Sequence, residues 1–198
     1  MMSLKTICLV SLFFVLPLVG RNIILEFKGA YFLSTDSMFK KIYGKGSALY
    51  GPELTVQLCE NKNLCLFASV DYLQKEGHSL GLCNRTKIKM IPVALGLKYV
   101  EPVFNHTDLY VGLGVEAVNV RTKNCSDFVI FEQSQWGIGG IAKAGAYYYL
   151  PCNFLLDFFI DYSFVKVGSN DCGCVPGLQL AKANLSGAIF GIGLGYNF

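Results

Sequence analysis

The sequence has 198 residues, of which 53% are hydrophobic and 16% are charged, and its formal net charge is +3. Soluble domains carry about 25% charged residues, so this composition is unusually apolar. The small net charge and the lack of interleaved aromatic and basic residues argue against a nucleic-acid-binding protein.

The first twenty residues differ from the rest of the chain. Lys5 precedes an apolar run from Ile7 to Val19, which has the length of a signal-peptide core and is short for a helix that crosses a bilayer. We therefore predict a secretory signal peptide at 1–20 and one domain at 21–198. A retained N-terminal anchor helix is the alternative. No later apolar run is long enough for a membrane-spanning helix.

Beyond the signal segment, apolar residues alternate with polar or small ones, a period of two that is typical of β-strands. Phe158 and Ile160, for example, alternate with Asp157 and Asp161. The pattern predicts eight strands, at about 24–33, 52–59, 64–74, 86–99, 107–119, 135–149, 154–166 and 185–198. Most of them exceed the five or six residues of a typical soluble strand. They approach the roughly 9–11 residues of a strand that crosses a membrane at a tilt.

Two positions interrupt this pattern. Pro92 lacks a backbone N–H and is unfavourable in a central strand, so we expect a bulge there. Val118 and Val120 flank Asn119 and shift the phase of the alternation. This shift predicts the end of the strand, or a bulge.

The connections between the predicted strands alternate between long and short, as in outer-membrane barrels with long external loops and short periplasmic turns. The predicted fold is thus all-β, an eight-stranded antiparallel up-and-down transmembrane β-barrel. Its apolar rows would face lipid, and its charged and glycine-rich rows would face the interior. Aromatic residues near strand ends would form the interfacial girdles: Tyr99, Tyr148, Tyr149, Tyr162 and Phe198. The alternative class is a soluble secreted barrel of lipocalin type that carries an apolar ligand, with the two faces reversed.

The first long connection, 34–51, contains the segment DSMFKKIYGKG. Asp36 or Ser37 is a suitable N-cap for one short helix. Lys40, Lys41 and Lys45 are a weak basic patch that we interpret as a solvated loop rather than a binding surface.

The last strand, IFGIGLGYNF, resembles the C-terminal signature of outer-membrane β-barrel proteins. The chain from 21 to 198 resembles the small eight-stranded class, which includes the OmpA transmembrane domain, OmpX and OmpW-like proteins. The segments FKGAYFLSTDSMFKKIYGKG and YGPELTVQL are similar to the opening of barrels from chlamydia-like bacteria. The resemblance implies that Phe198 and Tyr196 act as an assembly signal for the barrel-assembly machinery, and that the protein lies in the bacterial outer membrane.

Charged residues on the inward rows are the candidate site. Buried charges need partners, so we expect a paired polar network in the barrel lumen. Its predicted members are Glu26, Lys28, Glu53, Asp71, Lys98, Glu116, Lys143, Asp157 and Asp161. Eight strands leave little interior space, which favours a structural polar plug. A narrow ion path is the alternative, with a preference for cations because acids outnumber lysines.

The sequence contains no pattern that indicates catalysis, a metal site or a cofactor. The two histidines are His78 and His106. His78 adjoins Ser79, so their side chains would diverge on a strand, unlike those of a catalytic triad. The cysteine spacings do not match structural zinc sites. We therefore predict a protein that is not an enzyme.

The predicted mature domain has seven cysteines. An exported chain meets an oxidising environment, and Cys59 and Cys65 flank one short turn. They are a candidate disulfide if the two strands place them opposite each other. The odd count predicts a free thiol or a disulfide link to another envelope protein. The sequence thus predicts an outer-membrane barrel with a structural, surface-interaction or limited-permeability role, and a narrow channel for small solutes or ions as the alternative.

Overall fold

The computed structural model describes residues 22–59, 62–78, 85–125, 130–167 and 183–198. The predicted signal peptide at 1–20 lies outside these residues. None of the helices in the described part of the chain is long and apolar enough to cross a membrane.

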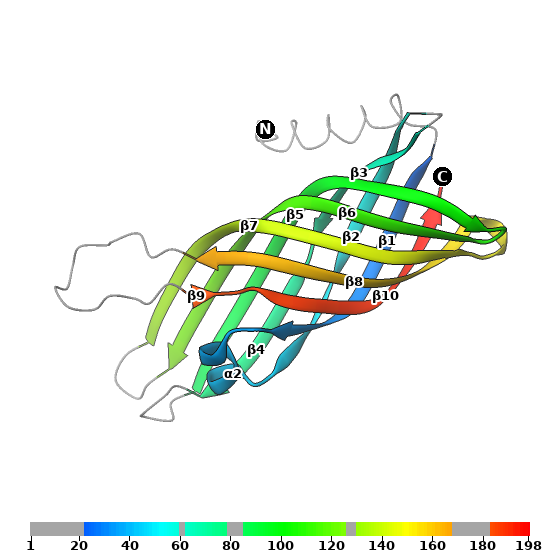
Figure 1. Ribbon diagram of the computed structural model, residues 1–198. Coiled ribbons are helices and arrows are strands. Elements are labelled where there is room, and N and C mark those ends of the chain that lie inside the picture. The colour runs from blue at the N-terminus through cyan, green and yellow to red at the C-terminus, as the bar shows by residue number, and fades with distance from the viewer. Residues whose placement is uncertain (1–21, 60–61, 79–84, 126–129, 168–182) are drawn as a thin grey trace, which may run out of the picture.

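The described chain forms one closed antiparallel sheet (Figure 1). Its strands are β1 (Ile23–Ser34), β2 (Gly46–Cys59), β3 (Lys62–Val70), β4 (Tyr72–His78), β5 (Arg85–Phe104), β6 (Thr107–Cys125), β7 (Ile130–Tyr149), β8 (Phe154–Val167), β9 (Ala183–Asn184) and β10 (Gly187–Asn197). Each long strand pairs with its neighbours in sequence, and β1 pairs with both β2 and β10, which closes the ring. This arrangement confirms the predicted eight-stranded antiparallel up-and-down barrel. β3 and β4 together form one of the eight strands, and the two-residue β9 precedes β10 along the same edge of β8.

The break between β3 and β4 lies opposite Pro92. The pairing register of β3 with β5 continues unchanged into β4, and Asp71 N–H donates to Pro92 O at 2.9 Å. Pro92 has no N–H to donate in return, so the ladder loses one hydrogen bond. The register of β5 with β6 also runs through Pro92 without a shift. The expected bulge at Pro92 was therefore wrong.

The two ends of the barrel differ. At one end, here called the turn end, β5 and β6 are joined by 105–106, and β7 and β8 by a short 3₁₀ segment, Pro151–Asn153. The C-terminal end of β10 lies there as well (Figure 1). The helix α2 (Ser37–Tyr43) lies at the opposite end, here called the loop end.

Alternation decides which side chains face lipid. On β8, Phe158 is 52% exposed and Ile160 is 68% exposed, whereas Asp157 and Asp161 are buried inside. On β5, the outward residues from Ile91 to Tyr99 are apolar or aromatic. This stretch extends about 30 Å along the strand, which at a tilt of about 40° covers most of the ~25 Å apolar band of an outer-membrane barrel.

The orientation excludes the lipocalin-type alternative, because that protein would need the opposite arrangement of faces. The expected girdle positions Tyr99, Tyr148 and Phe198 are exposed, and Tyr162 is half-buried. Tyr149 differs, because its ring faces inward and its hydroxyl donates to Asp108 Oδ2 at 2.8 Å.

The strands run further toward the loop end than the sequence pattern predicts. β6 continues to Cys125, and Val118 and Val120 are buried inside the barrel. The expected strand end or bulge at 118–120 was wrong, since the register of β6 with both neighbours is continuous there. The phase shifts because the interior changes from charged in the middle to apolar near the loop end.

Helix α2 packs into this apolar interior. Asp36 caps it by accepting a hydrogen bond from Phe39 N–H at 2.8 Å. Gly44 ends it with a φ of 84°, a left-handed conformation that favours glycine. The buried rings of Phe39 and Tyr43 contact each other and join the core that includes Phe32. The sequence segment read as a solvated loop is thus anchored in the barrel mouth, while Lys40, Lys41 and Lys45 stay exposed.

Candidate functional site in the barrel interior

Five strands bring charged side chains to one level of the interior. Each sits on the inward row of its strand because residues of the same parity share a face of the sheet. The charged cluster consists of Glu26 and Lys28 on β1, Glu53 on β2, Lys98 on β5, Lys143 on β7, and Asp157 and Asp161 on β8. All seven are buried. The structure therefore brings together seven of the nine residues that the sequence assigned to the lumen.

Glu53 is the centre of the charged cluster. Lys28 Nζ and Lys143 Nζ each donate to Glu53 Oε2 at 3.0 Å, and Lys98 Nζ donates to Glu53 Oε1. One carboxylate thus joins three lysines from three different strands. Because removal of one partner leaves a buried charge without compensation, such pairs are costly to break.

The lysines also reach the other carboxylates. Lys28 Nζ lies 3.1 Å from Asp157 Oδ2, and Lys143 Nζ lies 2.6 Å from Asp161 Oδ2. Lys98 Nζ lies 3.6 Å from Glu26 Oε1. The charged cluster is therefore a continuous network that links opposite walls of the barrel.

Aromatic residues complete the charged cluster, and the sequence analysis did not assign them to it. The Tyr110 hydroxyl donates to Asp157 at 3.0 Å, and the Tyr147 hydroxyl accepts from Lys98 Nζ at 2.7 Å. Lys98 Nζ also lies 4.4 Å from the Tyr110 ring centroid, and Lys28 Nζ lies 4.5 Å from that of Phe159. Tyr110 and Tyr147 follow the inward parity of their strands, which was the available signal for both.

Glycines make room for these large side chains. A Cβ atom on Gly193 would lie 3.2 Å from Asp157 Cβ and 3.3 Å from Glu26 Oε2. A Cβ atom on Gly145 would lie 2.6 Å from Tyr110 Oη. The glycine-rich row of β10 and the glycines of β7 therefore leave the space that the charged cluster fills.

Two predicted members lie apart from the charged cluster. Glu116 is buried, and its carboxylate accepts a hydrogen bond from Ser163 Oγ. Asp71 is only half-buried, at the interruption between β3 and β4. Within the described ranges, neither carboxylate has a lysine or arginine nitrogen within 4.0 Å. The alternation correctly predicted that both residues lie on the inward face of their strands. Their positions along the barrel axis differ from that of the charged cluster.

Some buried oxygen atoms have no hydrogen-bond partner among the described residues. They include Glu26 Oε2, Asp161 Oδ1 and Ser69 Oγ. Two of these three are carboxylate oxygens of the charged cluster, which has four acids and three lysines. The acids are therefore in excess by one.

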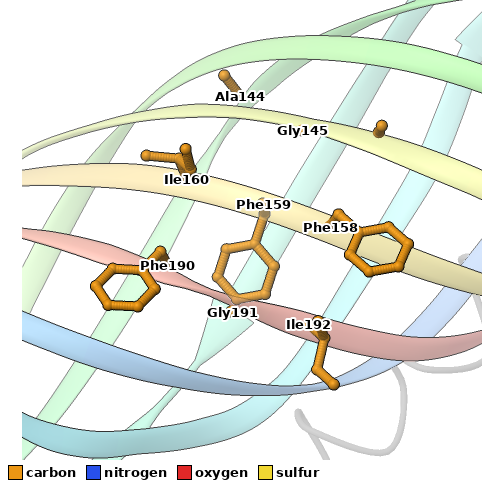
Figure 2. A pocket seen from close by; sticks show the side chains of 9 residues that line it. Ala144, Gly145, Phe158, Phe159, Ile160, Phe190, Gly191 and Ile192 are labelled. Atoms are coloured by element: carbon orange, nitrogen blue, oxygen red, sulfur yellow. The ribbon is translucent and has the colours of Figure 1, made fainter.

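The described residues line a polar cavity of about 180 Å³ inside the turn end, between Asn22, Asn63, Asp108 and Asn197. They also line an apolar groove of about 500 Å³ on the outer surface. Figure 2 shows its lining side chains on three adjacent strands. They include Ala144 and Ala146 on β7, Phe158 and Ile160 on β8, and Phe190 and Ile192 on β10. The groove exists because β7 has small residues there, and it opens toward lipid.

The cysteines that can be described do not form the expected hairpin staple. Cys65 is a free, buried thiol. The register pairs Cys65 with Gln57 and Cys59 with Lys62, so the condition that the two cysteines oppose each other is not met. Cys152 is free and exposed at the turn end. No group of three or more potential metal-binding side chains occurs in the described part of the chain.

The proposed assembly residues lie at the end of the barrel seam. The ring centroids of Tyr196 and Phe198 are 4.8 Å apart, and Phe198 is exposed. Phe198 N–H donates to Ile23 O at 2.9 Å, which extends the pairing of β10 with β1.

Comparisons with known proteins agree with this architecture. Among curated protein sequences, none matches the chain. Ail, the attachment invasion locus protein of Yersinia pestis, was solved in complex with the heparin analogue sucrose octasulfate. It aligns with a TM-score of 0.55 at 15% identity, over 89% of this chain and 97% of Ail. Neisserial surface protein A has a TM-score of 0.52 at 16% identity, over 89% and 97%. Outer membrane protein W of E. coli has a TM-score of 0.53 at 15% identity, over 91% and 99%.

These structural similarities establish a common fold. The sequence profile of the family described as the outer membrane protein beta-barrel domain matches residues 27–198, which cover nearly the whole described barrel. With apolar side chains outside and paired charges inside, the chain belongs to this family of bacterial outer-membrane β-barrel proteins.

Proposed function

We propose that the protein is a closed outer-membrane barrel with a structural and surface-interaction role, not a channel and not an enzyme. The observation that carries this proposal is the charged cluster, in which Glu53 joins three lysines across the lumen. Barrels of eight strands have an interior that side chains nearly fill. The side chains of the charged cluster, joined by ion pairs and hydrogen bonds, occupy the space that a water column would need.

The mouth of the barrel supports the same function. Phe39 and Tyr43 of α2 pack on Phe32 and on the apolar core at the loop end. The Tyr43 hydroxyl lies 3.3 Å from Thr86 Oγ1 on β5, which ties the helix to the wall. A solute would have to displace both this apolar layer and the charged cluster.

A narrow cation path is the second candidate function. It is favoured by the unpartnered carboxylate oxygens Glu26 Oε2 and Asp161 Oδ1, and by the polar cavity at the turn end. An excess of negative charge in a pore wall attracts cations. The path would need the lysines of the charged cluster to move aside.

Planar-bilayer recording of the purified full chain distinguishes these functions. We expect no unitary conductance in 1 M KCl from the wild type or from the Asp161→Asn variant. Cation-selective openings in the wild type that decrease in Asp161→Asn would contradict the closed barrel and support the second candidate. The matched control is Glu116→Gln, which removes a buried carboxylate that bonds Ser163 and contacts no lysine of the described ranges.

The partners follow from the same proposal. The exposed apolar belt contacts outer-membrane lipid, and Tyr196 and Phe198 are the proposed contact with the barrel-assembly machinery. The exposed thiol of Cys152 is the described residue best placed for a disulfide with another envelope protein. No part of the proposal requires a cofactor or nucleic acid.

A further inference from the structure

Four cations gather on the outer surface of the barrel near the loop end. The register of β5 with β6 places Lys87 opposite Lys123 and Lys89 opposite Arg121. All four are on the outward row, and Lys89, Arg121 and Lys123 are exposed. We name these four residues the basic block. Like charges directly opposite each other destabilise a sheet, so this arrangement needs anions from elsewhere.

In the described strands, two acidic residues pair with members of the basic block. Lys87 Nζ lies 3.7 Å from Glu76 Oε1 on β4, and the register pairs Lys123 with Glu132 on β7. Among the described residues that the register pairs with the basic block, two are acidic, so the four cations exceed the acids opposite them by two.

The surplus is centred on the second cationic pair. Lys89 is opposite Gln74 on one side of the basic block, and Arg121 is opposite Ser134 on the other. Both of these flanking residues are uncharged. Lys89 and Arg121 are therefore the members of the basic block without an acidic residue opposite them in the sheet.

The basic block lies at the level of lipid headgroups. The next outward row toward the middle of the barrel contains Ile91, Asn119 and Trp136. Trp136 is 63% exposed, and tryptophan concentrates at membrane–water interfaces. One outward row is about 7 Å along a strand, so Lys89 and Arg121 follow directly beyond this interfacial residue.

The loop end faces the cell exterior in barrels of this type, because their long loops are extracellular. The headgroups at this level belong to the outer leaflet. We propose that Lys89 and Arg121, flanked by Lys87 and Lys123, bind the phosphate groups of a phosphorylated glycolipid of the outer leaflet. Arg121 suits phosphate because a guanidinium donates two parallel hydrogen bonds, and the lysines contribute point charges. The inference needs only the position of the barrel in the membrane, and it holds whether or not the interior conducts.

The test uses the full chain purified in detergent and measures its binding of bisphosphorylated lipid A by native mass spectrometry. We expect the Lys89→Gln/Arg121→Gln double variant to bind about 30-fold more weakly than wild type. The matched control is Lys41→Gln/Lys45→Gln, which removes the same charge from exposed loop-end positions outside the basic block. Its affinity should stay within about twofold of wild type.

Further arms identify the source of the phosphate. Removal of the phosphates from lipid A should weaken its binding to wild type. The loss should equal the loss that the double variant shows with bisphosphorylated lipid A. Inorganic phosphate at millimolar concentration should compete poorly, because it lacks the acyl chains that hold the headgroup at this level. The Lys89→Arg/Arg121→Lys variant keeps the charge and should keep most of the binding, which separates a lost site from a lost fold.

Three results would overturn the proposal. One is unchanged binding in Lys89→Gln/Arg121→Gln. Another is an equal loss in Lys41→Gln/Lys45→Gln, which would mean that only the net charge matters. The third is full competition by inorganic phosphate, which would indicate a site for the free anion.

Discussion

Substitution of Glu53 by glutamine tests whether the charged cluster holds the barrel together. Glutamine keeps the shape of the side chain but removes the charge that three lysines share, two of them at 3.0 Å. Lys28 and Lys143 keep Asp157 and Asp161 as close partners. Among the described carboxylates, Lys98 keeps Glu26 alone, at 3.6 Å, beside the uncharged hydroxyl of Tyr147. Breaking a buried ion pair costs about 3–5 kcal/mol. We therefore expect Glu53→Gln to lower the free energy of unfolding by about that amount.

Urea unfolding in lipid vesicles, followed by Trp136 fluorescence and by the heat-dependent shift in gel mobility, measures this loss. Glu116→Gln is the matched control, since Glu116 is equally buried and its one hydrogen-bond partner among the described residues is Ser163. A hydrogen bond to a charged group contributes about 1.5–3 kcal/mol, and glutamine retains an acceptor, so a smaller loss is expected. An equal loss in both variants, or no loss in Glu53→Gln, would refute the role of Glu53 as the centre of the cluster.

Three further predictions concern space, depth and assembly. Gly145→Ala should destabilise the barrel by about 1–3 kcal/mol, because its Cβ would lie 2.6 Å from Tyr110 Oη. Gly140→Ala, whose Cβ would meet only Gly114 O at 3.5 Å, should be nearly neutral in the same unfolding assay. The fluorescence of Trp136, the single tryptophan of the chain, should be quenched more by lipids brominated near the headgroup than near the chain end; the reverse order would move the interface away from it. Phe198→Ala should lower the amount of folded barrel in the outer membrane of cells while the purified chain still refolds in detergent. Normal assembly in cells would remove Phe198 from the proposed signal.

The sequence was sufficient to predict the fold because successive residues of each barrel strand face lipid and interior in turn. The alternation of Phe158 and Ile160 with Asp157 and Asp161 follows directly from the period of a strand. The prediction of a strand end or bulge failed at Val118, where the apolar residues of the strand change from the lipid face to the interior. An apolar side chain is suited both to lipid and to a protein core, so the alternation alone does not show which of the two surrounds it.

The charged residues of the interior could be assigned to a face but not to partners. Glu53 and Lys143 are 90 positions apart, and their contact depends on the stagger of β2 against β7 around the ring. Tyr110 and Tyr147 looked like two more aromatics in an aromatic-rich chain, and only the closed barrel places their hydroxyls beside Asp157 and Lys98. The separation of Asp71 from the cluster has the same cause, since its height in the barrel is set by strand tilt.

Closure through β1 and β10 has a consequence for biogenesis. The ladder between these two strands runs from the pair Ile24 and Asn197 to the pair Ser34 and Gly187. The hydrogen bonds that close the barrel therefore join the two ends of the described chain. Contacts so distant in sequence form late. Until then, β1 and β10 each present an unpaired edge able to recruit a strand from another molecule. A newly exported chain therefore depends on rapid pairing of its own first and last strands. A high local concentration of unclosed chains favours strand pairing between molecules over closure of one barrel.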